Sequence, residues 1–449
     1  MSGSQDRSAM ELEELKDVVS VVIAEARQQG VDQAEAAASH DIGLSATARL
    51  GNVESLEYTN DRGVGLTVYK AGKKGSASTS DFSLAALREA VDKACTFAKY
   101  TAVDEASGLA DEELMAREIP DLDLMHQWQL DSTQAIQIAI DCEDAARSFD
   151  KRVTNSEGAT VTTSSGVRAY GNTHGFLAAY PKSSHSISCV VVGEENGDME
   201  RDYWYSSTRD AADLESPEEI GKTAARRTVE RLGSRKIKTD RAPVLFAPEV
   251  ARGFIGHAIS ALSGGAQYRR ASFLLDAAGD RLFPGFVQVS ERPHIHKAMA
   301  SAPFDAEGVV TRDREIVVDG VLQGYFLGSY SARRLGLATT GNAGGPHNLL
   351  VSGGSDDDLA SLIGSLKRGL LVQELIGQGV NGVTGDYSRG AVGYWIENGE
   401  IAHPVHEVTI AGNLKELYRR ISAIGKDQDL RSGIRCGSLL VDSMTIAGA

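Results

Sequence analysis

The residues best suited to chemistry lie in one stretch, residues 246–275. His257 occupies the middle of a segment whose apolar residues recur at helical spacing, and Arg252 lies five positions before it. Pro248 suits the first turn of a helix, where its missing N–H costs nothing. We therefore predict a helix that begins at Pro248 and is stopped by the glycines at 264–265.

His257 has two interpretations. A neutral imidazole is a common zinc ligand, but one histidine on an apolar helix is more often a satisfied core or interface residue. The pairs His294/His296 and His403/His406 could also face metal from a strand. No third ligand at matching spacing accompanies them, so chance surface placement is favoured. No Gly-x-Ser-x-Gly elbow is present, and serine hydrolase chemistry has no support.

Residues 377–393 form the most glycine-dense segment. It fits neither the dinucleotide-binding nor the P-loop pattern, because no Lys-Ser/Thr follows and no helix opens there. Tight turns in a β domain and a ligand-contacting loop explain it equally well. Within it, Asp386 and Arg389 could simply pair with each other.

The elements before residue 100 predict a helix-covered antiparallel sheet. A helix over 10–29 precedes alternating strand segments between residues 34 and 70, and a second helix covers 83–97. Turn residues at 51–52, 60–63 and 72–75 are expected to separate the strands. This arrangement is typical of an α+β layer.

The chain then predicts a connector, a second set of strands and a hinge. Residues 100–130 are acidic and irregular, and a helix over 131–149 leads into short strands between 153 and 192. A turn at residues 165–166 is expected to separate two of these strands. The acidic run 194–203 is interpreted either as a solvated turn or as a contact surface. A helix capped by Ser216 follows, and residues 233–238 are the predicted hinge.

The remaining residues predict a β-rich domain with inserted helices. The Asp319-Gly320 and Asn398-Gly399 pairs are hairpin signals, and helices are expected over 356–367 and 413–422. The fold class is thus α+β, with an N-terminal antiparallel sheet with helices and a C-terminal β-rich domain. The domains are 1–235, which can divide near 100–130, and 236–449.

The composition limits the classes of partner that the chain can be expected to bind. The chain has 449 residues, with 46 basic against 62 acidic side chains. This balance argues against nucleic acid as a partner, because phosphate binding needs a basic face. No apolar run is long enough to span a membrane, and the N-terminus has no signal-peptide core. Because this core is missing, a cytoplasmic location is expected. Four separated cysteines without a CxxC pair are expected to be reduced thiols.

Several segments together resemble the TldD/PmbA family of bacterial peptidases, specifically its PmbA (TldE) branch. Besides the helix around His257, the similarity is carried by four segments in the same order. They are Glu194–Tyr203, Gly328–Leu337, Gly385–Ala391 and Ile410–Lys415. The similarity runs from about residue 30 to the C-terminus.

The resemblance also marks a difference at the motif helix. In the TldD branch this helix carries His-Glu-x-x-x-His, two zinc ligands and a general base, and a C-terminal cysteine is a further ligand. Here His257 and Cys436 match two of those positions, but Arg252 and Gly253 replace the first histidine and the glutamate. A guanidinium stays protonated and cannot coordinate, and a catalytic zinc normally needs three protein ligands. The resemblance therefore implies no zinc in this chain, with His257 and Cys436 as a remnant, and no confident catalytic residue.

The resemblance implies a metal-free subunit that works with a zinc-holding TldD-like partner. The family cleaves unfolded or modified peptides, including peptide-antibiotic precursors and labile antitoxins. The peptide cleft is expected to be lined by five consecutive residues: Gly385, Asp386, Tyr387, Ser388 and Arg389. One rival is an autonomous metalloprotease that recruits a ligand such as His294 or His403. Another is a non-enzymatic, homodimeric peptide-binding modulator, and the isolated chain could form a homodimer in any case.

Overall fold

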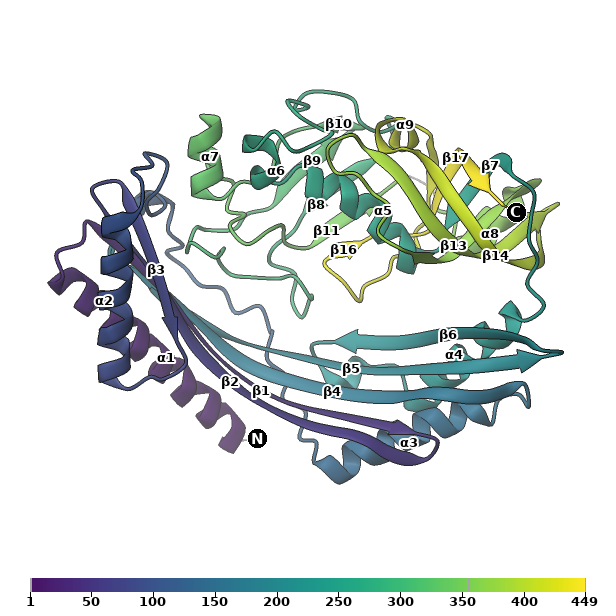
Figure 1. Ribbon diagram of the computed structural model, residues 1–449, viewed down its shortest axis with the longest axis horizontal. Helices are drawn as coiled ribbons and strands as arrows, with labels where there is room; N and C mark the ends of the chain where they lie inside the picture. Colours follow the sequence, from purple (N-terminus) through teal and green to yellow (C-terminus); the bar gives the residue numbers. More distant parts are fainter. Residues whose placement is uncertain (1, 354–355, 449) are drawn as a thin grey trace.

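The computed structural model describes residues 2–353 and 356–448 and has a mixed α+β architecture. Its N-terminal part is one six-stranded antiparallel sheet in the order β3-β2-β1-β4-β5-β6. The strands are β1 (Gln33–Arg49), β2 (Asn52–Lys70), β3 (Lys73–Thr79), β4 (Val153–Asn172), β5 (Leu177–Glu195) and β6 (Asp198–Thr208). The sheet is long and curved, and the C-terminal part lies over its concave face (Figure 1).

Strand alternation explains why four helices cover only the other face. The helices are α1 (Ser2–Gln28), α2 (Leu84–Tyr100), α3 (Ser132–Arg147) and α4 (Pro217–Arg231). In β1, Ala34, Ala36 and Ala38 are buried with residues of α1 and α2, while Ala46 is buried against α3. All are even-numbered, so they share one face. The odd-numbered residues of β1 therefore face the C-terminal part.

The predicted helices are confirmed, and their caps follow the sequence signals. Ser83 and Ser216 each accept a hydrogen bond from the backbone three residues on, and Asp131 forms a full capping box with Gln134. Residues 101–131 are the expected irregular connector, apart from one short 3-10 turn. Within the described residues, no helix combines the length and apolar character needed to cross a membrane.

Two of the predicted turns are wrong, because the strands run straight through them. Residues 60–63 lie inside β2, where every residue from 56 to 69 pairs in unbroken register with β1. Residues 165–166 likewise lie inside β4, paired on both sides. Ladders on one or both sides satisfy the backbone groups that a turn would have used, so local turn propensity is overridden. The run 194–203 contains an exposed hairpin turn at Asn196-Gly197 that joins β5 to β6, which agrees with its interpretation as a solvated turn.

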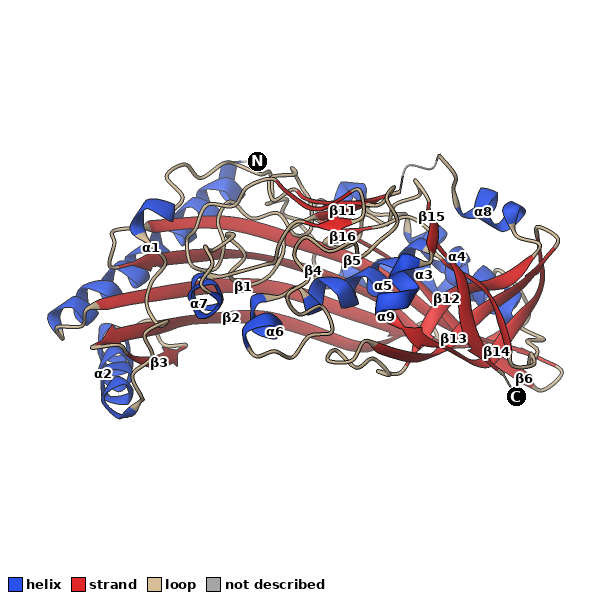
Figure 2. Cartoon of the chain, turned by 90° about the horizontal axis from the view of Figure 1, so that it is seen from above, coloured by secondary structure: helices blue, strands red, loops and turns tan. Residues whose placement is uncertain are grey.

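The C-terminal part contains two further sheets (Figure 2). The larger has the order β14-β13-β12-β7-β17-β15, and an extra pairing of β14 with β17 curls it back on itself. Its strands are β7 (Asp240–Phe246), β12 (Arg368–Ile376), β13 (Asp386–Glu397), β14 (Glu400–Asn413), β15 (Ile421–Ile424) and β17 (Leu439–Ala447). The smaller has the order β10-β9-β8-β11-β16. Its strands are β8 (Gln288–Glu291), β9 (Arg314–Val318), β10 (Val321–Leu322), β11 (Leu349–Ser352) and β16 (Ile434–Arg435).

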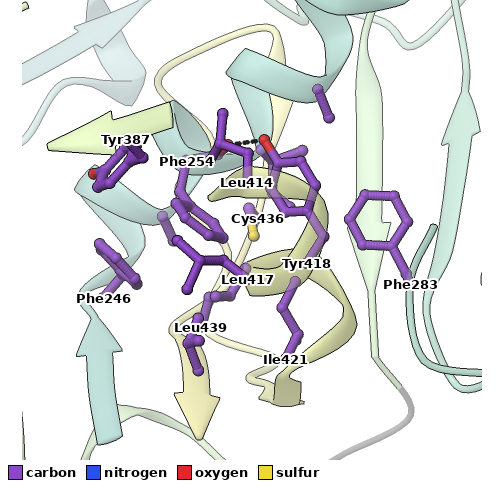
Figure 3. Close-up of a cluster of buried hydrophobic side chains, with 14 of the residues drawn as sticks. Phe246, Phe254, Phe283, Tyr387, Leu414, Leu417, Tyr418, Ile421, Cys436 and Leu439 are labelled. Carbon is purple, nitrogen blue, oxygen red and sulfur yellow. Dashed lines mark hydrogen bonds between the residues drawn. The ribbon is translucent and has the colours of Figure 1, made fainter. Parts of the chain in front are cut away.

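Helices inserted between these strands complete the core. They are α5 (Pro248–Ala261), α6 (Gly264–Tyr268), α7 (Ser329–Leu335), α8 (Leu359–Ser365) and α9 (Leu414–Arg419). Phe246 stacks on Phe254, and the edge of Phe254 meets Tyr418 of α9 (Figure 3). The hydroxyl of the buried Tyr418 donates to the carbonyl of Phe254 at 3.0 Å. This core fixes the orientation of α5, the predicted motif helix.

Candidate functional site

The described residues form an open cavity of about 810 Å³ beside α5. Gly253, Gly256, His257 and Ser260 line it, because residues spaced three and four apart share one helix face. Two glycines on that face leave the cavity open along the helix. The helix ends at Ala261, and Ser263 caps α6, so the glycines at 264–265 begin the next helix rather than stop this one.

His257 lies at the inner edge of this cavity. Its ring meets the ring of Tyr387 edge-on at 5.9 Å, and its Nε2 is buried without a hydrogen-bond partner among the described residues. Burial lowers the pKa of His257, and the positive charge of Arg389 lowers it further. The imidazole is therefore neutral at pH 7, and its buried Nε2 is unpaired among the described residues.

Replacing Arg389 with glutamine should raise the pKa of His257 toward the usual histidine range, because one of its two causes is removed. An imidazole NMR titration of wild type and Arg389→Gln measures this, with the exposed Arg419→Gln as control. Because the pKa of His257 is lower in the folded state, the unfolded state binds a proton first as the pH falls. The neutral histidine therefore costs no stability above the ordinary histidine pKa, and the protein loses stability as the pH falls below it. Identical titrations in all three proteins would contradict the assignment.

Arg252 points away from His257's environment and joins the two parts of the protein. Its guanidinium donates to the hydroxyl of Tyr205 on β6 at 2.8 Å and lies 3.3 Å from the carboxylate of Asp429. Asp429 also pairs with Arg431 at 2.9 Å, and Arg431 lies over the ring of Tyr205 at 4.4 Å. The motif position thus serves as a polar link between the sheet and the C-terminal part.

Further buried ion pairs extend this link. Arg227 of α4 contacts Glu249 of α5 at 2.8 Å, and Arg231 of α4 contacts Glu374 of β12 at the same distance. The carboxylate of Asp202, with a side chain 1% exposed, lies 3.4 Å from Arg227 and 3.2 Å from Arg231. Removing one partner of such a buried pair strongly destabilises the fold, because the other charge is left without compensation.

The residues at the motif positions do not fit a zinc ion. Cys436 is fully buried in the hydrophobic core, where burial raises the pKa of its thiol to about 12. Cys436 also does not line the cavity beside α5, whereas His257 does. Across residues 2–353 and 356–448, no three His, Cys, Asp or Glu side chains gather in a way that could hold a metal.

The other predicted site residues are placed as follows. Gly385 precedes β13, and Asp386–Arg389 begin that strand without lining the cavity beside α5. Asp386 accepts from Thr384 and Asn413, and Arg389 donates to the carbonyl of Leu375, so the suggested Asp386–Arg389 pair is wrong. A substrate-binding role for this segment stays a prediction.

Of the two histidine pairs that were expected on strands, one lies on a strand and the other does not. His294 and His296 lie in irregular backbone, not on a strand, and His294 pairs with the hydroxyl of Thr311 at 2.8 Å. His403 and His406 do lie on β14, where the Nδ1 of His403 is 3.1 Å from the carbonyl of Pro404.

A loop over residues 342–347 is a part of the site that sequence reasoning missed. Residues 343–344 line the cavity beside α5 and two further cavities, of about 650 and 250 Å³, against the sheet. Its only sequence signal is the density of small residues, two of which, Gly344 and Gly345, adopt positive φ. The loop therefore forms a common wall between the C-terminal part and the sheet.

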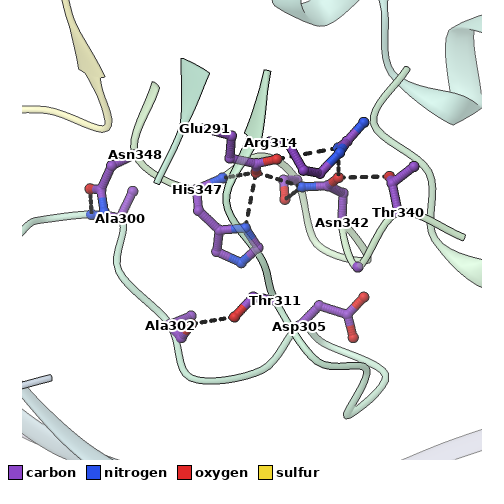
Figure 4. Close-up of polar contacts among 12 residues, drawn as sticks. Glu291, Ala300, Ala302, Asp305, Thr311, Arg314, Thr340, Asn342, His347 and Asn348 are labelled. Carbon is purple, nitrogen blue, oxygen red and sulfur yellow. Dashed lines mark hydrogen bonds and ion pairs between the residues drawn. The ribbon is translucent and has the colours of Figure 1, made fainter. Parts of the chain in front are cut away.

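Two buried carboxylates hold this loop, and Figure 4 shows the contacts of the first, Glu291. Glu291 accepts from the backbone N–H and the ring of His347 at 2.8 and 3.0 Å, and from the side chain of Asn342 at 2.7 Å. Arg314 lies 3.3 Å from Glu291. Asp305 accepts from the backbone N–H of Ala343 at 2.9 Å. Glu291 thus fixes both ends of the loop, and Asp305 fixes its first end a second time.

Family models match most of the chain. The PmbA/TldA metallopeptidase domain 1 matches residues 34–98, the central domain 126–232 and the C-terminal domain 239–448. The chain belongs to the PmbA/TldD metallopeptidase family. Its motif helix α5 lies within the C-terminal family domain, and the sheet strand that receives Arg252, β6, lies within the central one.

Individual relatives place the chain in the PmbA branch of this PmbA/TldD family. It is 48% identical to Metalloprotease PmbA of Escherichia coli O157:H7, covering 93% of this chain and 92% of that one. A structure from Bacteroides thetaiotaomicron, described as a candidate modulator of DNA gyrase, is 28% identical with a TM-score of 0.91, covering 97% and 99%. TldE from Thermococcus kodakarensis, 21% identical with a TM-score of 0.80 over 95% and 99%, shares the fold.

Proposed function

We propose that this chain is the metal-free, TldE-type subunit of a cytoplasmic complex that cleaves unfolded or modified peptides. A TldD-like partner would hold the zinc and carry out the hydrolysis. The observation that best supports this proposal concerns Arg252 on the motif helix α5. Arg252 stands where the family resemblance expects a zinc ligand, and it is held by Asp429 and Tyr205.

The cavities support a role in holding peptide. Two of them lie between the concave sheet and the C-terminal part. The third, beside α5, lies within the C-terminal part and is lined largely by glycine, serine and other small residues. Such walls expose backbone groups and place few side-chain demands on a ligand. An extended, unfolded chain suits them, because its main-chain groups are unpaired and its side chains vary.

The decisive experiment measures zinc and peptidase activity in the purified chain, alone and mixed with a TldD-like subunit. An unstructured peptide serves as substrate, and elemental analysis gives the zinc content. We expect no stoichiometric zinc and no cleavage by the chain alone, with cleavage in the mixture exceeding that of the partner alone.

Two other results would point to the rival functions. About one zinc per chain with chelator-sensitive cleavage would favour an autonomous metalloprotease using His257, Cys436 and a recruited ligand. Peptide binding without cleavage, even in the mixture, would favour a non-enzymatic modulator. Size-exclusion chromatography with light scattering of the same samples distinguishes a homodimer from a complex with the partner.

A further inference from the structure

Positive side chains gather in the cavity of about 250 Å³ between the sheet and the C-terminal part. Arg168 of β4 and Lys182 of β5 lie on the concave face, and Arg209 follows β6. Arg168 is directly opposite Tyr180 in the ladder, and Lys182 is two residues beyond Tyr180, so both point the same way. This clustering stands out in a chain with a formal net charge of −16.

Arg209 is a buried cation that has no carboxylate within ion-pair distance among the described residues. Arg209 is 8% exposed. Its guanidinium donates to the carbonyl of Ser183 at 2.7 Å and to that of Met299 at 2.6 Å. Its Nε is buried and has no hydrogen-bond partner among the described residues. Burying a charge without a counter-charge is costly, so an anion in this cavity would relieve that cost.

The exposed Arg168 and the half-buried Lys182 also lack a paired carboxylate within the described residues. The Arg168 guanidinium contacts the hydroxyl of Tyr180. Burial lowers the pKa of Lys182, the nearby Asp41 raises it, and Arg168 and Arg209 lower it again. A bound anion would favour the charged lysine.

Four other titratable groups line the cavity, and all are already engaged. The hydroxyl of Tyr170 donates to Glu35, and that of Tyr180 contacts Arg168. Asp305 accepts from the backbone N–H groups of Glu307, Val309 and Ala343, each at 2.9 Å. His347 is held by Glu291. Their hydrogen-bonding capacity is directed at the protein itself, which leaves the three cations as the groups that can meet a ligand.

We propose that Arg168, Lys182 and Arg209 form a subsite for a carboxylate of the bound peptide. The cavity has room for one side chain or chain end, and it shares residues 343–346 with the cavity beside α5, so an extended peptide could reach both. The carboxylate can come from an Asp or Glu side chain or from the C-terminus. This inference rests on the proposed peptide-binding function and adds a preference for acidic peptides.

The test is the binding of labelled unstructured peptides to the full chain, measured by fluorescence anisotropy at low salt. Four matched peptides are used: with central Glu or Gln, each with a free or an amidated C-terminus. Inorganic phosphate serves as a competitor. Wild type is compared with Lys182→Gln and Arg168→Gln, and with Lys93→Gln on the exposed side of α2 as control. Arg209 is left intact because it also links the sheet to Met299.

We expect the preferred carboxylate peptide to bind wild type about tenfold more tightly than its neutral match, the scale of a charge-assisted hydrogen bond. Both subsite variants should abolish that difference, leave binding of the neutral peptide unchanged and keep the wild-type thermal midpoint. The central-Glu and free-terminus arms identify which carboxylate binds. Displacement by phosphate more strongly than by peptide carboxylate would overturn the assignment to peptide.

The failure of this inference can be separated from failure of the proposed function. Equal binding of acidic and neutral peptides, unaffected by Lys182→Gln and Arg168→Gln, overturns the carboxylate subsite and leaves peptide binding standing. Binding of none of the four peptides, alone or with a TldD-like subunit present, overturns both.

Discussion

Replacing Glu291 with alanine should lower the free energy of unfolding by about 3–5 kcal/mol, because removing one partner of a buried ionic network leaves the others unpaired. Its side chain is 1% exposed and serves His347, Asn342 and Arg314. Burial opposes ionisation of Glu291, but hydrogen bonds from His347 and the charge of Arg314 outweigh it and lower its pKa. Urea unfolding followed by tryptophan fluorescence measures the loss.

The matched control is Glu315→Ala on the neighbouring strand. Glu315 pairs with Arg292 at 2.5 Å, but its side chain is 50% exposed, so we expect a loss under about 1 kcal/mol. Because the folded-state pKa of Glu291 is depressed, its contribution is present above the ordinary glutamate range and is lost as pH falls through the folded value. Equal losses for the two variants, or a Glu291 effect that persists in acid, would contradict the network's role.

Restoring the TldD-type motif with Arg252→His and Gly253→Glu should not create a zinc site. Cys436 is fully buried in the hydrophobic core and does not line the cavity beside α5. The double variant also loses the contacts of Arg252 to Asp429 and Tyr205, and we expect a cost of about 1.5–3 kcal/mol, typical of hydrogen bonds to charged groups. Elemental analysis and urea unfolding measure the two effects.

Arg334→His is the comparison for this experiment, because Arg334 is half exposed and lies 4.0 Å from Asp104. Its loss should be small. A double variant that binds about one zinc per chain and keeps wild-type stability would refute our interpretation, since it would mean that Cys436 can reach a metal at α5.

The sequence allowed prediction of the elements whose signals are local. The helix at Pro248, the capped helix at Ser216 and the hairpins at Asp319-Gly320 and Asn398-Gly399 all formed as predicted. The predicted turns within 60–63 and 165–166 were wrong because pairing with neighbouring strands is a long-range effect. A single sequence contains no direct sign of which strand will lie alongside.

The site was predicted only as far as one helix. The pattern around His257 identified α5, but the partners of Arg252 come from β6 and from residue 429, far away in sequence. The same holds for the loop over 342–347, whose supports Glu291 and Asp305 precede it by dozens of residues. Burial decides the state of Cys436, and no spacing rule gives the depth at which a thiol lies.

The wall formed by residues 343–344 has a thermodynamic consequence. Because it borders three cavities at once, any ligand that shifts it in one cavity changes the shape of the other two. Occupancy at these places is then coupled, and the coupling free energy must be the same in either direction. A peptide that fills one of these cavities would change the affinity of the other two for its remaining residues. The affinity should therefore increase cooperatively, not additively, with the length of the peptide.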